Sequence, residues 1–362
     1  MAMMRRAGPD GALVHRPAPA PGAPSRNRLE WVDAGRGVAI LLVVLYHASN
    51  WLAEAKLHVA YWQEINDVLA TMRMPLFFTL SGLFASKWLT ASWAALWNVK
   101  LRLLVWVFLL WEVIGTVVTY GALTLQGREF GLLHEARKLA LSPLAPQLEL
   151  WFLWVLALYF VVCKAIRRVD VRVQLGVAGV LSAVALSVDF ELVPWTVNIG
   201  WSGALKYILF FLAGIHLRSW ILAYAQRPAR VHVTVFAVWA LVATGVDVLE
   251  LRFVPVVYVL NCLLGVLAGV ALSRGLAGVA VLRRLGANTL PIYLAHTPLV
   301  IMVTTLVVLV GAAEELDVVH PVVPLALTAV AAASSLWLHR AASRGRGRWL
   351  YEPPADLLVR PS

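Results

Sequence analysis

Apolar stretches of about twenty residues recur along almost the whole chain, with short polar segments between them. A helix of about 20 apolar residues is long enough to cross the hydrocarbon core of a bilayer. The pattern therefore predicts an all-α fold, a polytopic membrane helix bundle with about ten transmembrane helices. The predicted spans are roughly 33–53, 68–89, 100–123, 150–166, 172–189, 201–221, 231–250, 255–273, 288–311 and 319–339.

The composition and the distribution of charge are typical of a membrane protein. Hydrophobic residues make up 60% of the chain and charged residues 14%, whereas a soluble domain carries about 25% charged residues. With the N-terminus placed in the cytoplasm, 24 of the 31 Lys and Arg residues fall on the inner side, five in outer loops and two inside spans. This asymmetry follows the positive-inside rule and predicts a multi-pass protein of the plasma (inner) membrane with both termini cytoplasmic. The net charge of +11 is therefore an orientation signal, and we expect no nucleic-acid partner.

Three regions are predicted along the chain. Residues 1–28 are rich in Pro, Ala and Arg and lack the apolar core of a signal peptide, so we expect a disordered cytoplasmic tail. Residues 29–340 form the membrane domain, and residues 341–362 form a basic cytoplasmic tail. The two cysteines fall within spans and the nine histidines are scattered, so we predict neither a disulfide framework nor a metal site.

The first apolar stretch, WVDAGRGVAILLVVLYHASNW, contains Arg36 and His47. At about 100° per residue, His47 returns to within roughly 20° of the helix face of Arg36, about 16 Å further along the axis. Asp33 lies on the same stripe, one turn before Arg36. Arg or Asp inside a membrane costs at least ~2.5 kcal/mol, so such groups persist where they line a polar cavity or perform chemistry. We therefore predict Asp33, Arg36 and His47 as catalytic residues.

Arg36 and His47 each have a simpler interpretation. Arg36 is near enough to the membrane surface for its side chain to reach lipid phosphate. His47 lies too deep for that, but a buried histidine can be satisfied by a hydrogen bond alone. A neutral imidazole at this depth can also act as a general base or as a nucleophile, and the sequence leaves these two roles open.

Two further ionisable residues are predicted to lie inside the membrane. Arg73 is about five residues from the outer end of the second span, at a depth similar to that of His47, where it either partners a bound acceptor or reaches outward to the surface. Glu112 is near the middle of the third span, and a carboxylate there is functional by default. The sequence leaves open whether Glu112 orients His47 or pairs with Arg73 or Lys206.

The remaining candidates for substrate binding lie in three other places. Ser81 is part of a small, close-packing Ser-Gly step in the second span. Glu149 and Trp151 begin the fourth span, where an acid beside an indole can hold a sugar, although an aromatic belt is the simpler explanation. Tyr293 and His296 share one face of the ninth span, and structural hydrogen bonding is the simpler role for His296. The predicted substrate-binding set is Arg73, Ser81, Glu112, Glu149, Trp151, Tyr293 and His296.

Several basic residues gather at the predicted cytoplasmic ends of the spans. Singly they are ordinary positive-inside anchors. Together they can form an anion site on the cytoplasmic face, and we predict that this site binds a phosphate-bearing cofactor. Its predicted members are Arg36, Lys100, Arg102, Arg283 and Arg284.

Six segments in order make the chain resemble the acyltransferase 3 family of integral-membrane transferases, in the branch of fucose 4-O-acetylase-like proteins. They are WVDAGRGVAILLVVLYH, MPLFFTLSGLFA, the basic start of the third span, LWFLWVL, FFLAGIHL and LGANTLPIYLAHTPL. The resemblance covers about residues 28–340 and implies a bundle of ten spans. It implies that Arg36 and His47 are tied to activity and that Ser81, Gly82, Tyr293 and His296 occupy family motif positions.

The resemblance also implies a reaction. Such proteins take an acyl group from a cytoplasmic coenzyme A thioester and deliver it to a hydroxyl of a lipid-linked sugar, a surface glycan or a metabolite. We therefore expect an O-acyltransferase whose donor substrate is acyl-CoA, with acetyl-CoA as the first candidate. Its expected partners are membrane lipids and a carbohydrate or glycosylated acceptor, and we expect no metal. Two alternatives stay open: succinyl transfer to a glucan, and a transporter or flippase of lipid-linked sugar. A transporter would more often show a two-fold internal repeat, and no clear repeat is visible.

Overall fold

The structure is a computed structural model that describes residues 29–57, 60–128, 131–146, 148–188, 198–312 and 321–359. Within these ranges the secondary structure is helical, and they contain no strand. The all-α prediction is confirmed for this part of the chain. The tail predicted over residues 1–28 lies outside the described residues.

Each of the ten predicted spans corresponds to a helix in the described residues. Six of these helices are long and apolar enough to cross a membrane, namely α1, the continuous stretch Trp93–Leu125 that ends in α5, α9, α11, α12 and α14. The other four differ for two reasons: α7 and α8 have only 15 and 17 residues, while α2 and α16 are long but carry more polar side chains. The ten are α1 (Glu30–Glu54), α2 (Ala60–Gly82), α5 (Arg102–Leu125), α7 (Trp151–Ala165), α8 (Val171–Ser187), α9 (Ile199–His216), α11 (Ala229–Val248), α12 (Pro255–Gly275), α14 (Thr289–Leu309) and α16 (Val323–Arg344).

Shorter helices connect these elements. The α-helical ones are α3 (Ser86–Thr90), α4 (Trp93–Leu96), α6 (Leu132–Leu141), α10 (Arg218–Tyr224) and α13 (Ala280–Ala287). A π-helical turn, η1 (Trp97–Leu101), joins α4 to α5, and 3₁₀ turns form η3 (Leu251–Phe253), η4 (Arg346–Leu350) and η5 (Ala355–Leu357).

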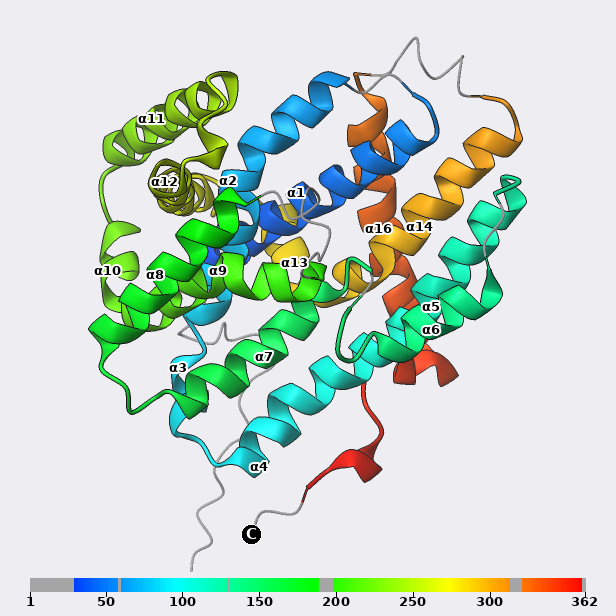
Figure 1. Ribbon diagram of the computed structural model, residues 1–362, viewed down its shortest axis with the longest axis horizontal. Helices are drawn as coiled ribbons and strands as arrows, with labels where there is room; N and C mark the ends of the chain where they lie inside the picture. Colours follow the sequence, from blue (N-terminus) through cyan, green and yellow to red (C-terminus); the bar gives the residue numbers. More distant parts are fainter. Residues whose placement is uncertain are drawn as a thin grey trace, which may run out of the picture.

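Helix α1 lies in the middle of the bundle (Figure 1). It packs against α2, α12, α13, α14 and α16, while α2 packs in turn against α9 and α12. Helices α8, α10, α11 and α12 form one side of the molecule in Figure 1, and α5, α6, α14 and α16 form the other. Because neighbouring helices surround α1, its polar side chains can face protein instead of lipid.

Two glycines allow α2 and α9 to approach each other backbone to backbone. A Cβ atom on Gly82 would lie 2.2 Å from the carbonyl oxygen of Phe211, and one on Gly214 would lie 2.2 Å from that of Thr79. Both distances are far shorter than a van der Waals contact, so only glycine fits at these two positions. Small residues at a helix crossing are typical of membrane bundles.

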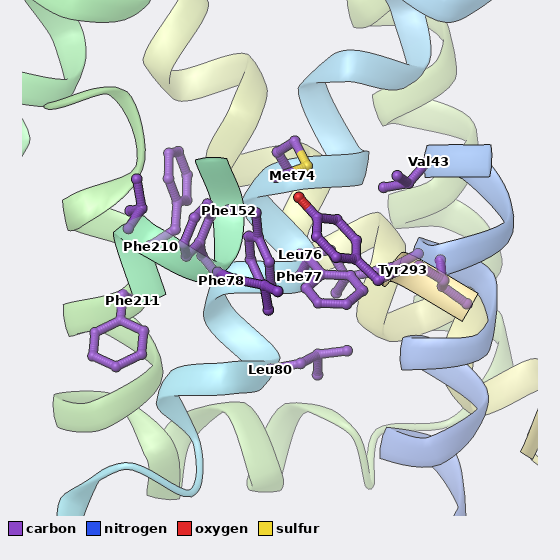
Figure 2. Packing of buried hydrophobic residues seen from close by; sticks show 14 of the residues in the cluster. Val43, Met74, Leu76, Phe77, Phe78, Leu80, Phe152, Phe210, Phe211 and Tyr293 are labelled. Carbon is purple, nitrogen blue, oxygen red and sulfur yellow. The ribbon is translucent and has the colours of Figure 1, made fainter. Parts of the chain in front are cut away.

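Aromatic side chains fill the core between α2, α7 and α9 (Figure 2). The rings of Phe77 and Phe78 each lie 4.7 Å from the ring of Phe152, centroid to centroid. Tyr293 of α14 borders this cluster, with its ring 5.5 Å from that of Phe152. Edge-to-face and tilted aromatic packing of this kind helps to fix the position of Tyr293.

The segment that follows α16 is held against the other helices. Three indole nitrogens of the α4–α5 stretch donate hydrogen bonds to its backbone carbonyls: Trp97 to Leu357 (3.0 Å), Trp106 to Trp349 (2.7 Å) and Trp111 to Leu350 (2.8 Å). The region predicted as a basic tail is therefore packed on α5 over the residues that the structure describes.

Candidate active site

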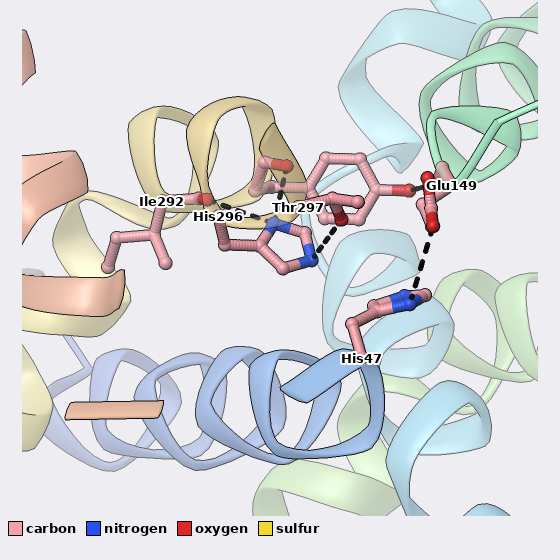
Figure 3. Close-up of polar contacts among 6 residues, drawn as sticks. His47, Glu149, Ile292, His296 and Thr297 are labelled. Atoms are coloured by element: carbon pink, nitrogen blue, oxygen red, sulfur yellow. Dashed lines mark hydrogen bonds and ion pairs between the residues drawn. The ribbon is translucent and has the colours of Figure 1, made fainter. Parts of the chain in front are cut away.

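His47 of α1 faces a carboxylate from another part of the chain. Its Nδ1 atom lies 3.7 Å from Oε1 of Glu149, which belongs to the loop before α7 (Figure 3). The indole of Trp51, one turn beyond His47 on α1, hydrogen-bonds the same carboxylate. The His47 and Glu149 side chains are 14% and 22% exposed, so the pair is shielded but accessible to a small molecule. Burial raises the pKa of the Glu149 carboxyl, and the hydrogen bond from Trp51 opposes that effect.

His296 of α14 lies beside His47 but is committed to other partners. The two imidazole rings are 5.2 Å apart, centroid to centroid. Nδ1 of His296 lies 2.8 Å from the carbonyl oxygen of Tyr293 and 3.1 Å from that of Ile292, so this nitrogen must donate (Figure 3). Nε2 then accepts from the Thr297 hydroxyl at 3.1 Å. His296 is fully buried with both ring nitrogens engaged, which favours the simpler structural role.

Tyr293 links α14 to the Glu149 loop. Its phenol donates a hydrogen bond to the backbone carbonyl of Glu149, so the same short segment that carries the carboxylate is fixed from a second side. Glu112 of α5 is buried and interacts electrostatically with the Tyr293 phenol. The sequence left Glu112 as a possible partner of His47, whereas the carboxylate that faces His47 belongs to Glu149.

Arg73 of α2 is buried and close to His47. Its guanidinium lies over the ring of Tyr46, 4.3 Å from the centroid, and donates to Oδ1 of Asn66 at 3.3 Å. The Tyr46 ring in turn contacts His47, with 5.0 Å between centroids. Arg73 also acts electrostatically on His47, so the structure brings together the two residues that were predicted to share one depth.

A cavity of about 250 Å³ begins at the opposite end of α1 from His47. Arg36, Lys100, Ser81 and Thr289 contribute polar groups to its wall, and the remaining lining is aromatic or aliphatic. The guanidinium of Arg36 lies 5.2 Å from the ring centre of Phe84. Lys87 and Lys100 lie 5.0 Å and 5.7 Å from the ring centre of Trp88. The π-helical turn Trp97–Leu101 carries Lys100, and such turns are common at functional sites.

Tyr293 stands between this cavity and His47. It lines the large cavity together with Phe77 and Phe152, and it also lines a small pocket that contains Glu149 and Thr297. Figure 2 shows the Tyr293 ring next to Phe77 and Phe152. Tyr293 therefore borders both the cavity and the pocket of Glu149, the residue that faces His47.

Three basic residues predicted for the donor site lie outside the cavity lining. Arg102 donates to the carbonyl of Pro354 at 3.2 Å, so it holds the C-terminal segment. Arg283 lies 3.6 Å from the Glu30 carboxylate and also donates to a backbone carbonyl at the end of α12. Arg284 is exposed on α13. The structure thus brings Arg36 and Lys100 together and separates the other three from them.

Two other predicted residues lie apart from the cavity and from the His47–Glu149 pair. Asp33 is buried where α1 meets α13, and a Cβ atom on Gly286 would lie 1.7 Å from its carbonyl oxygen. The Trp151 ring packs against Gly203 and stacks with Tyr207, 5.9 Å between centroids. The indole that reaches Glu149 is that of Trp51, which sequence reasoning did not single out.

Lys87, Phe84 and Trp88 were also missed. They follow the Ser-Gly step of α2, where an isolated Trp beside a Lys looks like an ordinary interfacial anchor. Their position in the structure shows that they gather at the mouth of the cavity with Lys100. The only signal in the sequence was the proximity of this aromatic segment to the next basic stretch.

Comparisons with known proteins show which family the chain resembles. A family model described as an acyltransferase domain matches residues 29–340. The chain is similar to the inner membrane protein YcfT of Escherichia coli (strain K12), with 23% identity over 354 residues that cover 90% of this chain and 96% of that protein. No solved structure matches the chain. The matched range runs from α1 into α16 and so includes every residue of the site.

Proposed function

The chain belongs to the acyltransferase 3 family, and from this premise we propose a specific reaction for it. The protein moves an acyl group, with acetyl as the first candidate, from cytoplasmic acyl-coenzyme A to a hydroxyl of a sugar, surface glycan or glycosylated metabolite. The observation that carries the proposal is the position of Tyr293, which lines the cation-lined cavity and also the small pocket that contains Glu149, the carboxylate that faces His47.

The cavity suits a coenzyme A thioester. Arg36 and Lys100 attract the phosphates, while Phe84 and Trp88 offer ring faces to the adenine. Deeper in the cavity, Leu153 and its aliphatic and aromatic neighbours surround the less polar pantetheine arm. About 16 Å of helix separates Arg36 from His47, close to the reach of that arm. A movement of the Tyr293 ring then admits the thioester to His47.

His47 acts as the general base in this proposal. Nδ1 is the nitrogen that faces the Glu149 carboxylate, 3.7 Å away, so the carboxylate favours the tautomer with its proton on Nδ1 and leaves Nε2 to accept a proton. Glu149 holds that tautomer and stabilises the imidazolium that forms when the proton arrives.

The transfer conserves every atom and proton. The acceptor hydroxyl gives its proton to Nε2 of His47 as its oxygen attacks the thioester carbonyl carbon, and a new C–O bond forms. The tetrahedral oxyanion is stabilised by the nearby positive charge of Arg73. Collapse breaks the C–S bond, and the proton on His47 passes to the departing thiolate. The products are an O-acyl ester and free coenzyme A.

Reconstituted wild-type protein tests the proposed function. The protein in lipid nanodiscs is incubated with radiolabelled acetyl-coenzyme A or succinyl-coenzyme A and with envelope glycans extracted from a deletion strain. Release of free coenzyme A together with label in the glycan fraction supports the proposal, and comparison of the two donors identifies the acyl group. Movement of a lipid-linked sugar across vesicles without any donor consumption would instead identify a transporter.

A further inference from the structure

A second polar pocket lies at the end of the bundle opposite the cation-lined cavity. It has a volume of about 30 Å³ and is formed by α2, α11, η3 and α12. This is room for about two water molecules, or for one edge of a larger ligand. Its polar lining residues are Asp67, Thr71, Asp247, Arg252, Tyr258 and Asn261.

Close packing of α12 on α2 places Asn261 in this pocket. A Cβ atom on Gly265 would lie 2.4 Å from the carbonyl oxygen of Thr71, so the two helices approach closely there. Asn261 lies one turn before Gly265 on α12. The Thr71 hydroxyl is already used, because it donates to the carbonyl of Val68 and accepts from the indole of Trp239.

Asn261 is 2% exposed, and neither Nδ2 nor Oδ1 of its amide has a hydrogen-bond partner. A buried polar group left unsatisfied costs about 1–3 kcal/mol, and this amide presents both a donor and an acceptor. Such an arrangement persists where a ligand supplies the missing partners. The pocket is open toward Asp67 and Arg252, which are exposed at this end of the bundle.

The chemistry of the lining selects the kind of ligand. A metal cation or an ammonium would satisfy Oδ1 of Asn261 and the carboxylates but would leave Nδ2 without an acceptor. An anion would satisfy Nδ2 and would be attracted by Arg252, but it would leave Oδ1 without a donor and would face the carboxylates of Asp67 and Asp247. A hydroxyl both donates and accepts, so adjacent hydroxyls satisfy the amide and both carboxylates together. We propose that this pocket, lined by Asn261, Asp247 and Asp67, binds neighbouring hydroxyls of an uncharged sugar.

This inference rests on the proposed function, because it makes the pocket a subsite for the acyl acceptor. Asp67 and Tyr258 interact electrostatically with Arg73, and Arg73 interacts with His47. A sugar held at Asn261 would therefore lie on the Arg73 side of His47, whereas the cation-lined cavity is bordered by Tyr293.

Two variants and one matched control test the subsite. Asn261→Leu keeps the branching at Cγ but replaces the amide with larger methyl groups, and Asp247→Asn removes one charge from the pocket lining. Glu250→Gln removes a carboxylate just beyond the end of α11 but outside the pocket, so it serves as the control. Thermal unfolding of each variant in nanodiscs confirms that it folds.

Saturation-transfer NMR on the full chain in nanodiscs measures binding directly. The probes are methyl glucoside (neutral), glucosamine (cationic) and glucuronate (anionic). With wild-type protein, we expect methyl glucoside to give the strongest signal of the three probes. Its signal should fall by at least about threefold in Asn261→Leu and in Asp247→Asn, and it should not change in Glu250→Gln. An unchanged signal in Asn261→Leu would mean that the pocket holds only water, and stronger binding of a charged probe would also overturn the assignment.

Transfer kinetics separate this inference from the proposed function. With acetyl-coenzyme A and envelope glycans, we expect Asp247→Asn to raise KM for the glycan about tenfold, the effect of one lost charged hydrogen bond, with KM for the donor unchanged. If the wild-type protein transfers acetyl groups and both variants keep the wild-type KM for the glycan, the subsite is rejected and the proposed function stands. A wild-type protein without transfer would reject the proposed function, and the NMR measurement would still decide the subsite.

Discussion

Nδ1 of His47 lies 3.7 Å from Oε1 of Glu149, and this contact joins the middle helix of the bundle to the loop before α7. If Glu149 orients His47, Glu149→Gln removes the charge that stabilises the imidazolium while keeping the shape. We expect kcat to fall by about 10²-fold, the lower end of a general-base contribution, with donor binding unchanged. Steady-state kinetics with acetyl-coenzyme A measure this effect. A kcat within twofold of wild type would exclude the orienting role.

The pH dependence of the reaction follows from the same carboxyl. Burial raises the pKa of Glu149, so this group gains its proton at a higher pH than an exposed glutamate, whose pKa is about 4.3. Activity that needs the carboxylate is therefore present above the raised pKa and is lost as the pH falls through it. Trp51→Phe removes a hydrogen bond that lowers this pKa, so the acid limb of kcat should move to higher pH. An acid limb that stays in place or moves down contradicts this account.

Donor binding should depend on the basic residues in the cavity lining and not on every basic residue nearby. Arg36→Ala removes a cation from the wall, and we expect the Kd for coenzyme A to rise about tenfold, equivalent to about 1.4 kcal/mol. Arg284→Ala is the matched control, since Arg284 is exposed on α13 outside the lining. Calorimetric titration of the purified proteins measures both constants. Equal effects of the two substitutions would remove Arg36 from the donor site.

The crossing of α2 and α9 makes a prediction about stability. Gly82→Ala places a methyl group against the backbone of Phe211, which cannot rotate away, so we expect a loss of about 1–3 kcal/mol. Gly176→Ala on α8 meets open space and should be neutral or stabilising by up to about 1 kcal/mol. Thermal unfolding in one detergent compares the two variants. A Gly82→Ala protein as stable as Gly176→Ala would show that the helices are not in close contact.

Much of the fold could be predicted because local composition determines where a membrane helix forms. The first span was expected at about 33–53 and α1 covers Glu30–Glu54, and the eighth was expected at 255–273 and α12 covers Pro255–Gly275. The number of helices long and apolar enough to span a membrane was less predictable. Helices α7 and α8 are short, so hydropathy alone does not decide how each relates to the bilayer.

The site was most predictable where its residues lie on one helix. Periodicity placed Arg36 and His47 on a common face of α1, but it could not place Glu149, because that contact depends on how the loop before α7 packs on α1. The same limit explains Arg102, whose partner is the carbonyl of Pro354 in a segment predicted to be a free tail. Pairings between distant segments are set by helix packing and not by local pattern.

The most direct measurement compares single-turnover acyl transfer by wild type and His47→Ala in the same nanodisc preparation. Each sample receives radiolabelled acetyl-coenzyme A and envelope glycan, and the Kd for coenzyme A is measured in parallel. The account predicts that His47→Ala loses transfer by at least about 10²-fold while its Kd stays within twofold of wild type. Transfer at the wild-type rate by His47→Ala would contradict the account, because no proton acceptor at His47 would then be needed.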